Sequence, residues 1–188
     1  MESTPRNEEH LPAGKLKTIV TYLEMRSKPS RKAADPPSPD FTIMRAVRPT
    51  ISFYRYLYNT VGEPWLWGDR RKLSDEELGA IVQHPAVEVY VLYVAGVPAG
   101  YVELDLRQPP DIELAYFGLM PEFIGQGWGR FLLDWAIDKA WSYNPRRLWL
   151  HTCNLDHPRA LSVYQRAGFV PYKEEIEIVD DPRALGLM

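Results

Sequence analysis

Residues Glu113–Trp141, ELAYFGLMPEFIGQGWGRFLLDWAIDKAW, decide the fold of this chain. The largely apolar run from Glu113 to Leu119 predicts a strand, and a bend at Pro121 follows it. After three glycines, apolar side chains recur at the i, i+4, i+7 spacing of a helix that buries one face. The sequence therefore predicts a strand, a glycine loop and a helix in direct succession.

The loop, with Gly125, Gly127 and Gly129, suits an anion. Glycines let a ligand approach backbone N–H groups that no Cβ shields, and the first N–H groups of a helix attract negative charge. Arg130 places a cation in the first helical turn, which is unfavourable for the helix alone but is explained by an anionic ligand. The loop matches neither the G-x-G-x-x-G fingerprint nor a Walker loop. We interpret it as a phosphate-binding loop, with a flexible connection that binds nothing as the alternative.

This segment resembles the pyrophosphate loop of the GNAT N-acetyltransferase superfamily, whose pattern is Arg/Gln-x-x-Gly-x-Gly/Ala. Gly127 and Gly129 stand at its two small positions, and Ile124 replaces the Arg or Gln, so that Arg130 would supply the missing charge. The stretch NLDHPRALSVYQRAGF, residues 154–169, is similar to a later motif of the superfamily: Asn, then Ala-x-x-x-Tyr, then Gly-Phe. The resemblance covers residues 85–179.

The resemblance implies an α/β (α+β) fold with a mixed, mostly antiparallel central sheet flanked by helices. Runs rich in β-branched and aromatic residues predict strands at 17–26, 41–47, 87–94, 99–106, 113–119, 147–152 and 170–179. Helical spacing and capping residues predict helices at 50–59, from Ser74, after the glycine loop and from Asp156. The strand at 17–26 precedes the superfamily-like part, so we expect it to be an extra N-terminal strand at an edge of the sheet.

Length and composition indicate one domain of ordinary composition, with 188 residues, 45% apolar and 25% charged. Residues 1–16 are predicted to be disordered, and residues 17–188 to form a single acetyltransferase domain. The net charge of −3 argues against general nucleic-acid binding. We expect no membrane partner and a cytoplasmic location, because no apolar run reaches membrane-span length and the one cysteine fits a reducing compartment. A homodimer is compatible with the resemblance, since superfamily members often dimerise.

Acetyl-CoA is the cofactor that the resemblance implies, with its pyrophosphate on the loop and its pantetheine arm along the preceding strand. Asn154 would bond to the pantetheine amides, and Arg166 would add charge near the phosphates. Gly118 would leave room for the ligand, although a bend in the strand explains a glycine there as well. The residues that the resemblance assigns to the cofactor are Phe117, Gly118, Leu119, Ile124, Gly125, Gln126, Gly127, Trp128, Gly129, Arg130, Asn154 and Arg166.

Two residues are candidates for proton transfer. Glu113 is a carboxylate in an otherwise apolar strand, where desolvation would raise its pKa towards the working range of a base. Several superfamily members carry a glutamate at the matching position, acting directly or through water. Tyr164 stands at the motif tyrosine, where superfamily members protonate the departing thiolate, and a phenol is protonated at neutral pH. The alternatives are a solvent-facing Glu113 and a Tyr164 that only packs.

The acceptor is not identified by the sequence. Tyr54, Trp65 and Trp67 precede the core motifs, where superfamily members build the acceptor pocket, and are candidates for an aromatic wall. Packing of these aromatics around a peripheral helix is the alternative. His151 is a further candidate for the lining of the site. No metal is expected because the histidines lack ligand spacing, and Cys153 lacks the pattern of a nucleophile.

The resemblance, together with these patterns, implies an acetyl-CoA-dependent N-acetyltransferase that transfers the acetyl group directly to a primary amine of a small molecule or peptide. An acyl-CoA-binding sensory or regulatory module without turnover is the alternative, and an unrelated interaction domain is a third.

Overall fold

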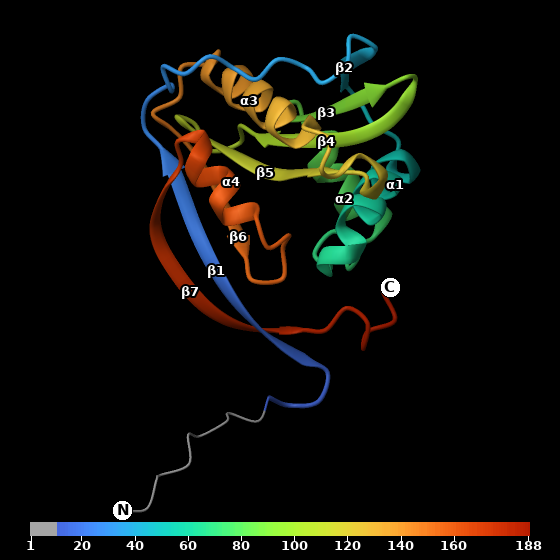
Figure 1. Ribbon diagram of the computed structural model, residues 1–188. Coiled ribbons are helices and arrows are strands. Elements are labelled where there is room, and N and C mark those ends of the chain that lie inside the picture. The colour runs from blue at the N-terminus through green and yellow to red at the C-terminus, as the bar shows by residue number, and fades with distance from the viewer. Residues whose placement is uncertain (1–10) are drawn as a thin grey trace, which may run out of the picture.

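The computed structural model describes residues 11–188, which form a seven-stranded sheet with helices on both faces (Figure 1). The strand order is β2-β3-β4-β5-β6-β1-β7, and every neighbouring pair is antiparallel except β5 and β6. The strands are β1 (Lys15–Met25), β2 (Phe41–Ala46), β3 (Val87–Val94), β4 (Val97–Asp105), β5 (Asp111–Leu119), β6 (Arg147–Cys153) and β7 (Val170–Asp180). The helices are α1 (Ile51–Gly62), α2 (Asp75–Val82), α3 (Trp128–Trp141) and α4 (Ala160–Ala167), with short 3₁₀ turns η1 (Glu63–Trp65) and η2 (Pro121–Phe123). The predicted fold class is confirmed.

The predicted disordered segment, residues 1–16, lies outside the described residues as far as residue 10. β1 begins at Lys15, so the end of that segment belongs to the sheet.

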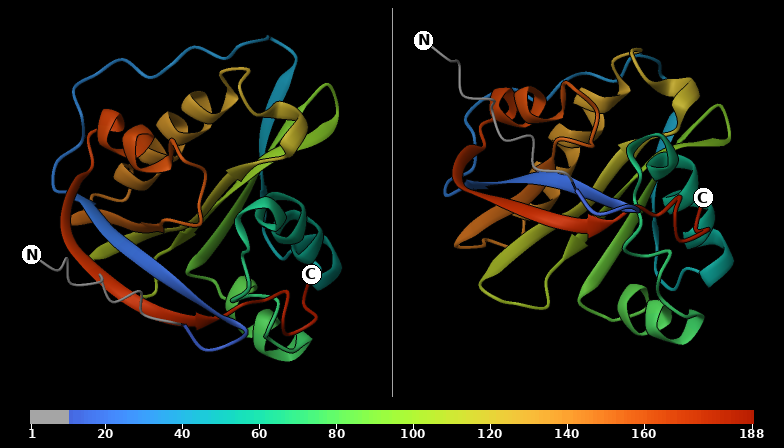
Figure 2. Two further views of the ribbon diagram at one scale, coloured as in Figure 1. Left: turned by 60° about the horizontal axis from the view of Figure 1, so that its bottom comes forward. Right: turned by 90° about the horizontal axis from the view of Figure 1, so that it is seen from below.

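Two layers of helices bury the two faces of the sheet. α3 and α4 cover one face, and α1 and α2 cover the other face over β3, β4 and β5 (Figures 1 and 2). Leu132 and Leu133 are fully buried in the first core, and Leu57 and Leu78 in the second. Because both faces are closed over β4 and β5, these strands are rigid supports for the loops at their ends.

The first strand lies between β6 and β7, antiparallel to both, and the predicted edge position is wrong. Leu23 and Met25 of β1 are buried in the core beneath α3. This burial agrees with a position between two other strands of the sheet. β7 forms the edge instead. The first and last strands therefore pair with each other, and their ribbon curves away below the rest of the sheet (Figures 1 and 2).

β5 and β6 pair over only part of their length. Their parallel register covers three positions and ends at Glu113, opposite Trp149. Beyond this point β5 stays paired with β4 as far as Leu119, and β6 stays paired with β1 as far as Cys153. Because each strand keeps its outer neighbour, the sheet opens between them.

Candidate active site

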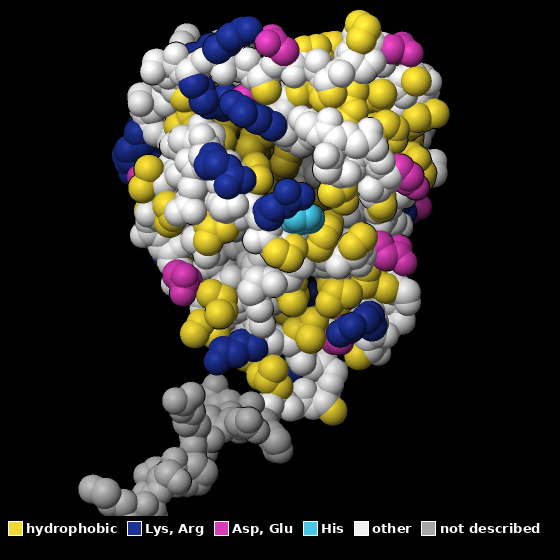
Figure 3. All heavy atoms as spheres, viewed as in Figure 1, with side chains coloured by type: hydrophobic (Ala, Val, Ile, Leu, Met, Phe, Trp, Pro, Cys, Tyr) yellow, Lys and Arg dark blue, Asp and Glu magenta, His cyan; other side chains and the backbone are white. Residues whose placement is uncertain are grey.

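A cavity of about 500 Å³ occupies the opening between β5 and β6. Its lining comes from both faces of the sheet: the glycine loop and α4 on one side, and residues 65–69 with the start of β1 on the other. Lys and Arg side chains gather over α4 beside a recessed patch of apolar side chains (Figure 3). The cavity therefore has a basic entrance on the side of α3 and α4.

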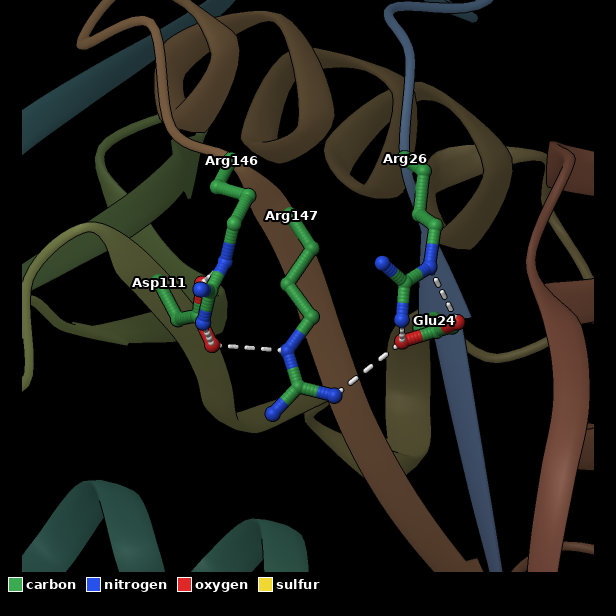
Figure 4. Close-up of polar contacts among 5 residues, drawn as sticks. All are labelled: Glu24, Arg26, Asp111, Arg146 and Arg147. Carbon is green, nitrogen blue, oxygen red and sulfur yellow. Dashed lines mark hydrogen bonds and ion pairs between the residues drawn. The ribbon is translucent and has the colours of Figure 1, made fainter.

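The opposite end of the same two strands is closed by ion pairs. Asp111 accepts hydrogen bonds from Arg146 (2.9 and 3.0 Å) and from Arg147 (2.8 Å), and Arg147 also donates to Glu24 of β1 (3.0 Å). Glu24 accepts a further hydrogen bond from Arg26 (Figure 4). These five residues, called the clamp below, join β5, β6 and β1 where the strands still pair. Asp111 of the clamp lies two residues before Glu113, where the pairing of β5 with β6 ends.

The glycine loop presents a row of free donors to the cavity. α3 begins at Trp128 with Gly127 as its N-cap, and Gly125 and Gly127 have φ of +84° and +90°. Among residues 11–188, no acceptor bonds to any of the six backbone N–H groups from Gly125 to Arg130. A Cβ added at Gly125 would meet no atom within 4 Å, so the backbone there is open to a ligand. The arrangement is suited to a phosphate group.

Three arginines line the cavity beside this row: Arg130 of α3, Arg159 at the start of α4, and Arg166 of α4. All three are exposed, and within the described part of the chain none of their guanidinium groups has a hydrogen bond or ion-pair partner. Ile124 also lines the cavity, but with an apolar side chain. Arg159 was not singled out from the sequence, because nothing in its local pattern distinguishes it from an ordinary surface arginine.

Tyr164 of α4 reaches the cavity between two aromatic rings. Its ring packs edge-on against Phe117 of β5 (centroids 6.2 Å apart) and Phe169 (6.1 Å). Burial raises the pKa of the phenol well above its ordinary value. Its hydroxyl has no hydrogen-bond partner among the described residues. The side chain is a protonated donor that is fixed in place and unused.

Glu113 lies beside the cavity and does not line it. Its Oε1 is 3.6 Å from Nδ1 of His151, and His151 itself lines the cavity. Contact with the Glu113 carboxylate raises the pKa of His151 above its ordinary value. The imidazole thus stands between the predicted base and the space where a substrate would bind.

Four of the residues predicted for the site have side chains elsewhere. Tyr54 is fully buried and donates a hydrogen bond to Glu103, so it belongs to the core beneath α1. The indole of Trp128 is buried against Phe41 and Phe131, which leaves only its backbone N–H on the loop.

Asn154 and Gln126 also point away from the cavity. The Asn154 amide accepts from the Ile19 backbone (2.7 Å) and donates to the Lys17 carbonyl (3.4 Å), because interior strand β1 lies beside it. The Gln126 side chain donates to the Glu122 carbonyl (2.6 Å). The Asn154 amide thus bonds to the sheet, whereas the sequence interpretation assigned it to the pantetheine amides.

Trp65 and Trp67 do line the cavity, in the segment that follows α1. The Trp67 Nε1 donates to Asp156 (3.1 Å), which also accepts from the hydroxyl of Thr152 (2.6 Å). This pair of bonds ties the segment after α1 to the end of β6. Asp69 follows in the same segment, lines the cavity and is exposed, and was missed because a single loop aspartate carries no pattern.

Gly118 lines the cavity, but the structure explains the glycine in a third way, apart from room for a ligand or a bend in the strand. A Cβ at this position would clash with Val61 of α1. The glycine is therefore required for the close packing of α1 on β5, independently of any ligand.

Other chemistries find little support. Cys153 is half-buried, and burial raises the pKa of its thiol, which disfavours the reactive thiolate. Residues 11–188 contain no cluster of three or more His, Cys, Asp and Glu side chains placed to hold a metal ion. Over the same residues, no helix has both the length and the apolar character needed to cross a bilayer.

A mixed sheet that opens between two parallel strands, with unpaired N–H groups of a helix start at the opening, is the arrangement expected of an α/β acyltransferase. Residues 53–169, more than half of the chain, match the Acetyltransferase (GNAT) family, and the chain belongs to this family. The resemblance deduced from the two motifs is confirmed.

Individual relatives agree with this assignment. An N-acetyltransferase of Lactobacillus delbrueckii subsp. lactis, itself uncharacterized, is 25% identical over 120 residues, which are 60% of this chain and 69% of that protein. A conserved protein of unknown function from Staphylococcus epidermidis has the same fold (TM-score 0.62, 20% identity), over 89% of this chain and 63% of that chain. IAA acetyltransferase from Bacillus cereus (TM-score 0.55, 22% identity) matches over 71% of this chain and 79% of that one. This chain spans less than two thirds of the S. epidermidis protein, and the two structural matches show the fold alone.

Proposed function

We propose that this protein transfers the acetyl group of acetyl-CoA to a primary amine. The observation that carries the proposal is the row of six free N–H groups, flanked by three unpaired arginines, at one end of a cavity that also contains Tyr164. Free donors and unpaired cations together match a ligand with several phosphates.

The residues present fit such a ligand along its whole length. The N–H groups of residues 125–130 would hold the diphosphate, and Arg130, Arg159 and Arg166 would neutralise its charges and those of a further phosphate. Phe117 and Leu119 give the opening between β5 and β6 apolar walls for a flexible arm. When bound, acetyl-CoA supplies the activated thioester. The chain's own task is to hold it and to move protons.

Tyr164 would give its proton to the sulfur that leaves. Its raised pKa keeps the phenol protonated through the physiological range, and a donor must be protonated to act. Packing between Phe117 and Phe169 fixes the direction of its hydroxyl. Such positioning is a large part of what an enzyme contributes to acyl transfer.

The acceptor would enter from the other side of the sheet. Trp65, Trp67 and Tyr116 supply aromatic walls there, and Asp69 and His151 supply polar groups. Arg71 donates a hydrogen bond to the carbonyl of Leu187 (2.8 Å), which ties the segment after α1 to the residues after β7, and Pro182 of those residues lines the cavity. Aromatic walls with a carboxylate suit an amine that carries a positive charge.

Thiol release from acetyl-CoA, measured with polyamines, amino acids, aminoglycosides and peptides as separate pools, tests this function. Release with at least one pool is the expected result. Thermal stabilisation by acetyl-CoA without release in any pool would instead identify a binding module without turnover, and no stabilisation at all would overturn the cofactor assignment.

A matched pair of glycine variants tests whether the N–H groups of the glycine loop bind CoA. Gly125 and Gly96 have nearly equal φ (+84° and +82°), and a Cβ at either would meet nothing within 4 Å. Gly125→Ala and Gly96→Ala should therefore lose similar stability, about 1 kcal/mol each for an alanine in the left-handed region. Only Gly125→Ala should weaken CoA binding, by about tenfold or more, since one to two charge-assisted hydrogen bonds are disturbed. Equal CoA affinity in the two variants would contradict the proposal that the glycine loop holds the diphosphate of CoA.

A further inference from the structure

The side chains of His151 and Glu113 meet where the sheet opens. Glu113 stands at the last parallel pair of β5 and β6, and His151 lies two residues beyond its partner Trp149, on the same face of β6. The Oε1 of Glu113 is 3.6 Å from Nδ1 of His151. The other ring nitrogen, Nε2, has no partner among the described residues, and the side chain lines the cavity.

The imidazole is held on its other sides by aromatic rings. Tyr22 of β1 packs against it with centroids 5.8 Å apart, and Trp149 at 6.4 Å. Asp156, after β6, and Asp69, after α1, also act on it, and both are negative like Glu113. The groups around His151 therefore stabilise a proton on the ring.

Glu113 is less well placed to meet a substrate. Its side chain is only 22% exposed, and it is absent from the cavity lining. The carboxylate touches the imidazole, and the imidazole touches the cavity. A proton leaving a substrate would reach His151 first.

We propose that His151 is the general base of the transfer reaction and that Glu113 is the positioning residue that orients it and holds its charge. This assignment rests on the proposed function and replaces the prediction that Glu113 is itself the base. It names a catalytic residue, His151, that no sequence motif had marked.

The proton balance is complete with groups that this chain supplies. The acceptor ammonium gives one proton to Nε2 of His151 and becomes the nucleophilic amine. As the N–C bond forms and the C–S bond breaks, Tyr164 gives its proton to the leaving sulfur, and the second proton lost by nitrogen restores the phenol through solvent. His151 then releases its proton to water, so each turnover yields an amide, a thiol and one proton.

The pH dependence of turnover follows from the effect of the Glu113 carboxylate on the pKa of His151. Only the neutral imidazole accepts a proton, so turnover should fall as the pH drops through the pKa of His151. The Glu113 carboxylate raises that pKa, so Glu113→Gln should move the acidic limb of the pH profile to lower pH. Had Glu113 been the base, the same substitution would abolish this limb.

The experiment measures kcat against pH for the wild type, His151→Gln, Glu113→Gln and the control His84→Gln, whose histidine is exposed after α2 and does not line the cavity. In parallel, NMR titrates the imidazoles without any substrate. We expect His151→Gln to lose about 100-fold or more in kcat together with the acidic limb. Glu113→Gln should lose less, should move the limb to lower pH, and should lower the titration midpoint of His151 by NMR.

Retention of the limb in His151→Gln, or an unchanged His151 midpoint in Glu113→Gln, would overturn the proposal. A wild type that releases no thiol with any amine would overturn the proposed function and the base role together. The NMR titration needs no turnover, so it tests the contact between Glu113 and His151 even if the protein releases no thiol. A failure of the proposed function is therefore distinguishable from a failure of the contact.

Discussion

The two ends of the β5–β6 pair differ in how their charges are used. At the closed end, the carboxylates of Glu24 and Asp111 are bonded to arginines in the clamp. At the open end, among the residues described, Arg130, Arg159 and Arg166 and the N–H groups of the loop have no partners. Arginines at both ends of these strands therefore differ in their partners. A structural arginine is paired with a carboxylate of the protein, whereas an arginine that is available to bind a ligand has no such partner.

The largest effect is expected at Tyr164, where the open end performs its chemistry. Tyr164→Phe removes the donor hydroxyl and keeps the ring that packs on Phe117, so kcat should fall by about 100-fold or more while CoA affinity stays nearly unchanged. Tyr56→Phe, at an exposed position on α1, is the control. Steady-state kinetics and calorimetric CoA titration measure the two quantities. Equal losses of turnover and CoA binding would argue for a packing role alone.

Exchanging one arginine at each end for alanine separates the two uses of charge. Arg130→Ala should weaken CoA binding by about tenfold, the worth of one charge-assisted hydrogen bond. Without ligand it should leave stability unchanged or raise it by about 0.3–1 kcal/mol, because a cation at a helix N-terminus is unfavourable.

Arg146→Ala should behave in the opposite way. Arg146 is 64% exposed, so its loss should lower the free energy of unfolding only slightly, and CoA affinity should not change. Urea unfolding and CoA titration of both variants give all four numbers. If Arg146→Ala lost CoA affinity and Arg130→Ala lost stability, the division between the two ends would be refuted.

The smallest expected effect is a loss of folding stability at acidic pH. Hydrogen bonds from Arg26 lower the pKa of Glu24, and hydrogen bonds from Arg146 lower the pKa of Asp111. A carboxyl group with a lowered folded-state pKa contributes stability above its unfolded pKa and loses it as the pH falls through the folded value. The clamp should therefore stabilise the fold fully above about pH 4.5 and progressively less below that.

Thermal unfolding between pH 3 and 6 measures this dependence. The double substitution Arg26→Ala and Arg146→Ala removes the main hydrogen-bond donor of each carboxylate, so it should flatten the loss of stability on acidification, whereas Arg130→Ala should leave the profile unchanged. A wild-type slope that persists in the double variant would place the acid sensitivity outside the clamp.

The local parts of this architecture are readable from sequence. The glycine loop, the start of α3 and the capping box at Ser74 and Glu77 all depend on residues within a few positions of each other, and the structure has them as predicted. Tyr164 was marked by the resemblance to the Ala-x-x-x-Tyr, Gly-Phe motif, and the structure places it on α4 against Phe117 of β5.

The long-range parts were not readable. The position of β1 between β6 and β7 depends on which strands meet, and the alternation of its side chains does not report that. The surroundings of Asn154 and Tyr54 were unreadable for similar reasons: the first residue bonds to β1, whose place in the sheet was not predicted, and the second is buried in the core beneath α1. The contact of Glu113 with His151 joins two strands that are 38 positions apart in sequence and is visible only in three dimensions.

The central claim is that the open end grips phosphate, and the most direct test compares two ligands that differ in phosphate content. Calorimetric titration with CoA and with pantetheine, which lacks the diphosphate and the nucleotide, should give a dissociation constant for CoA at least about 100-fold lower, as expected when several charge-assisted hydrogen bonds are gained. Arg130→Ala should narrow that difference. Equal dissociation constants for the two ligands in the wild type would contradict the account.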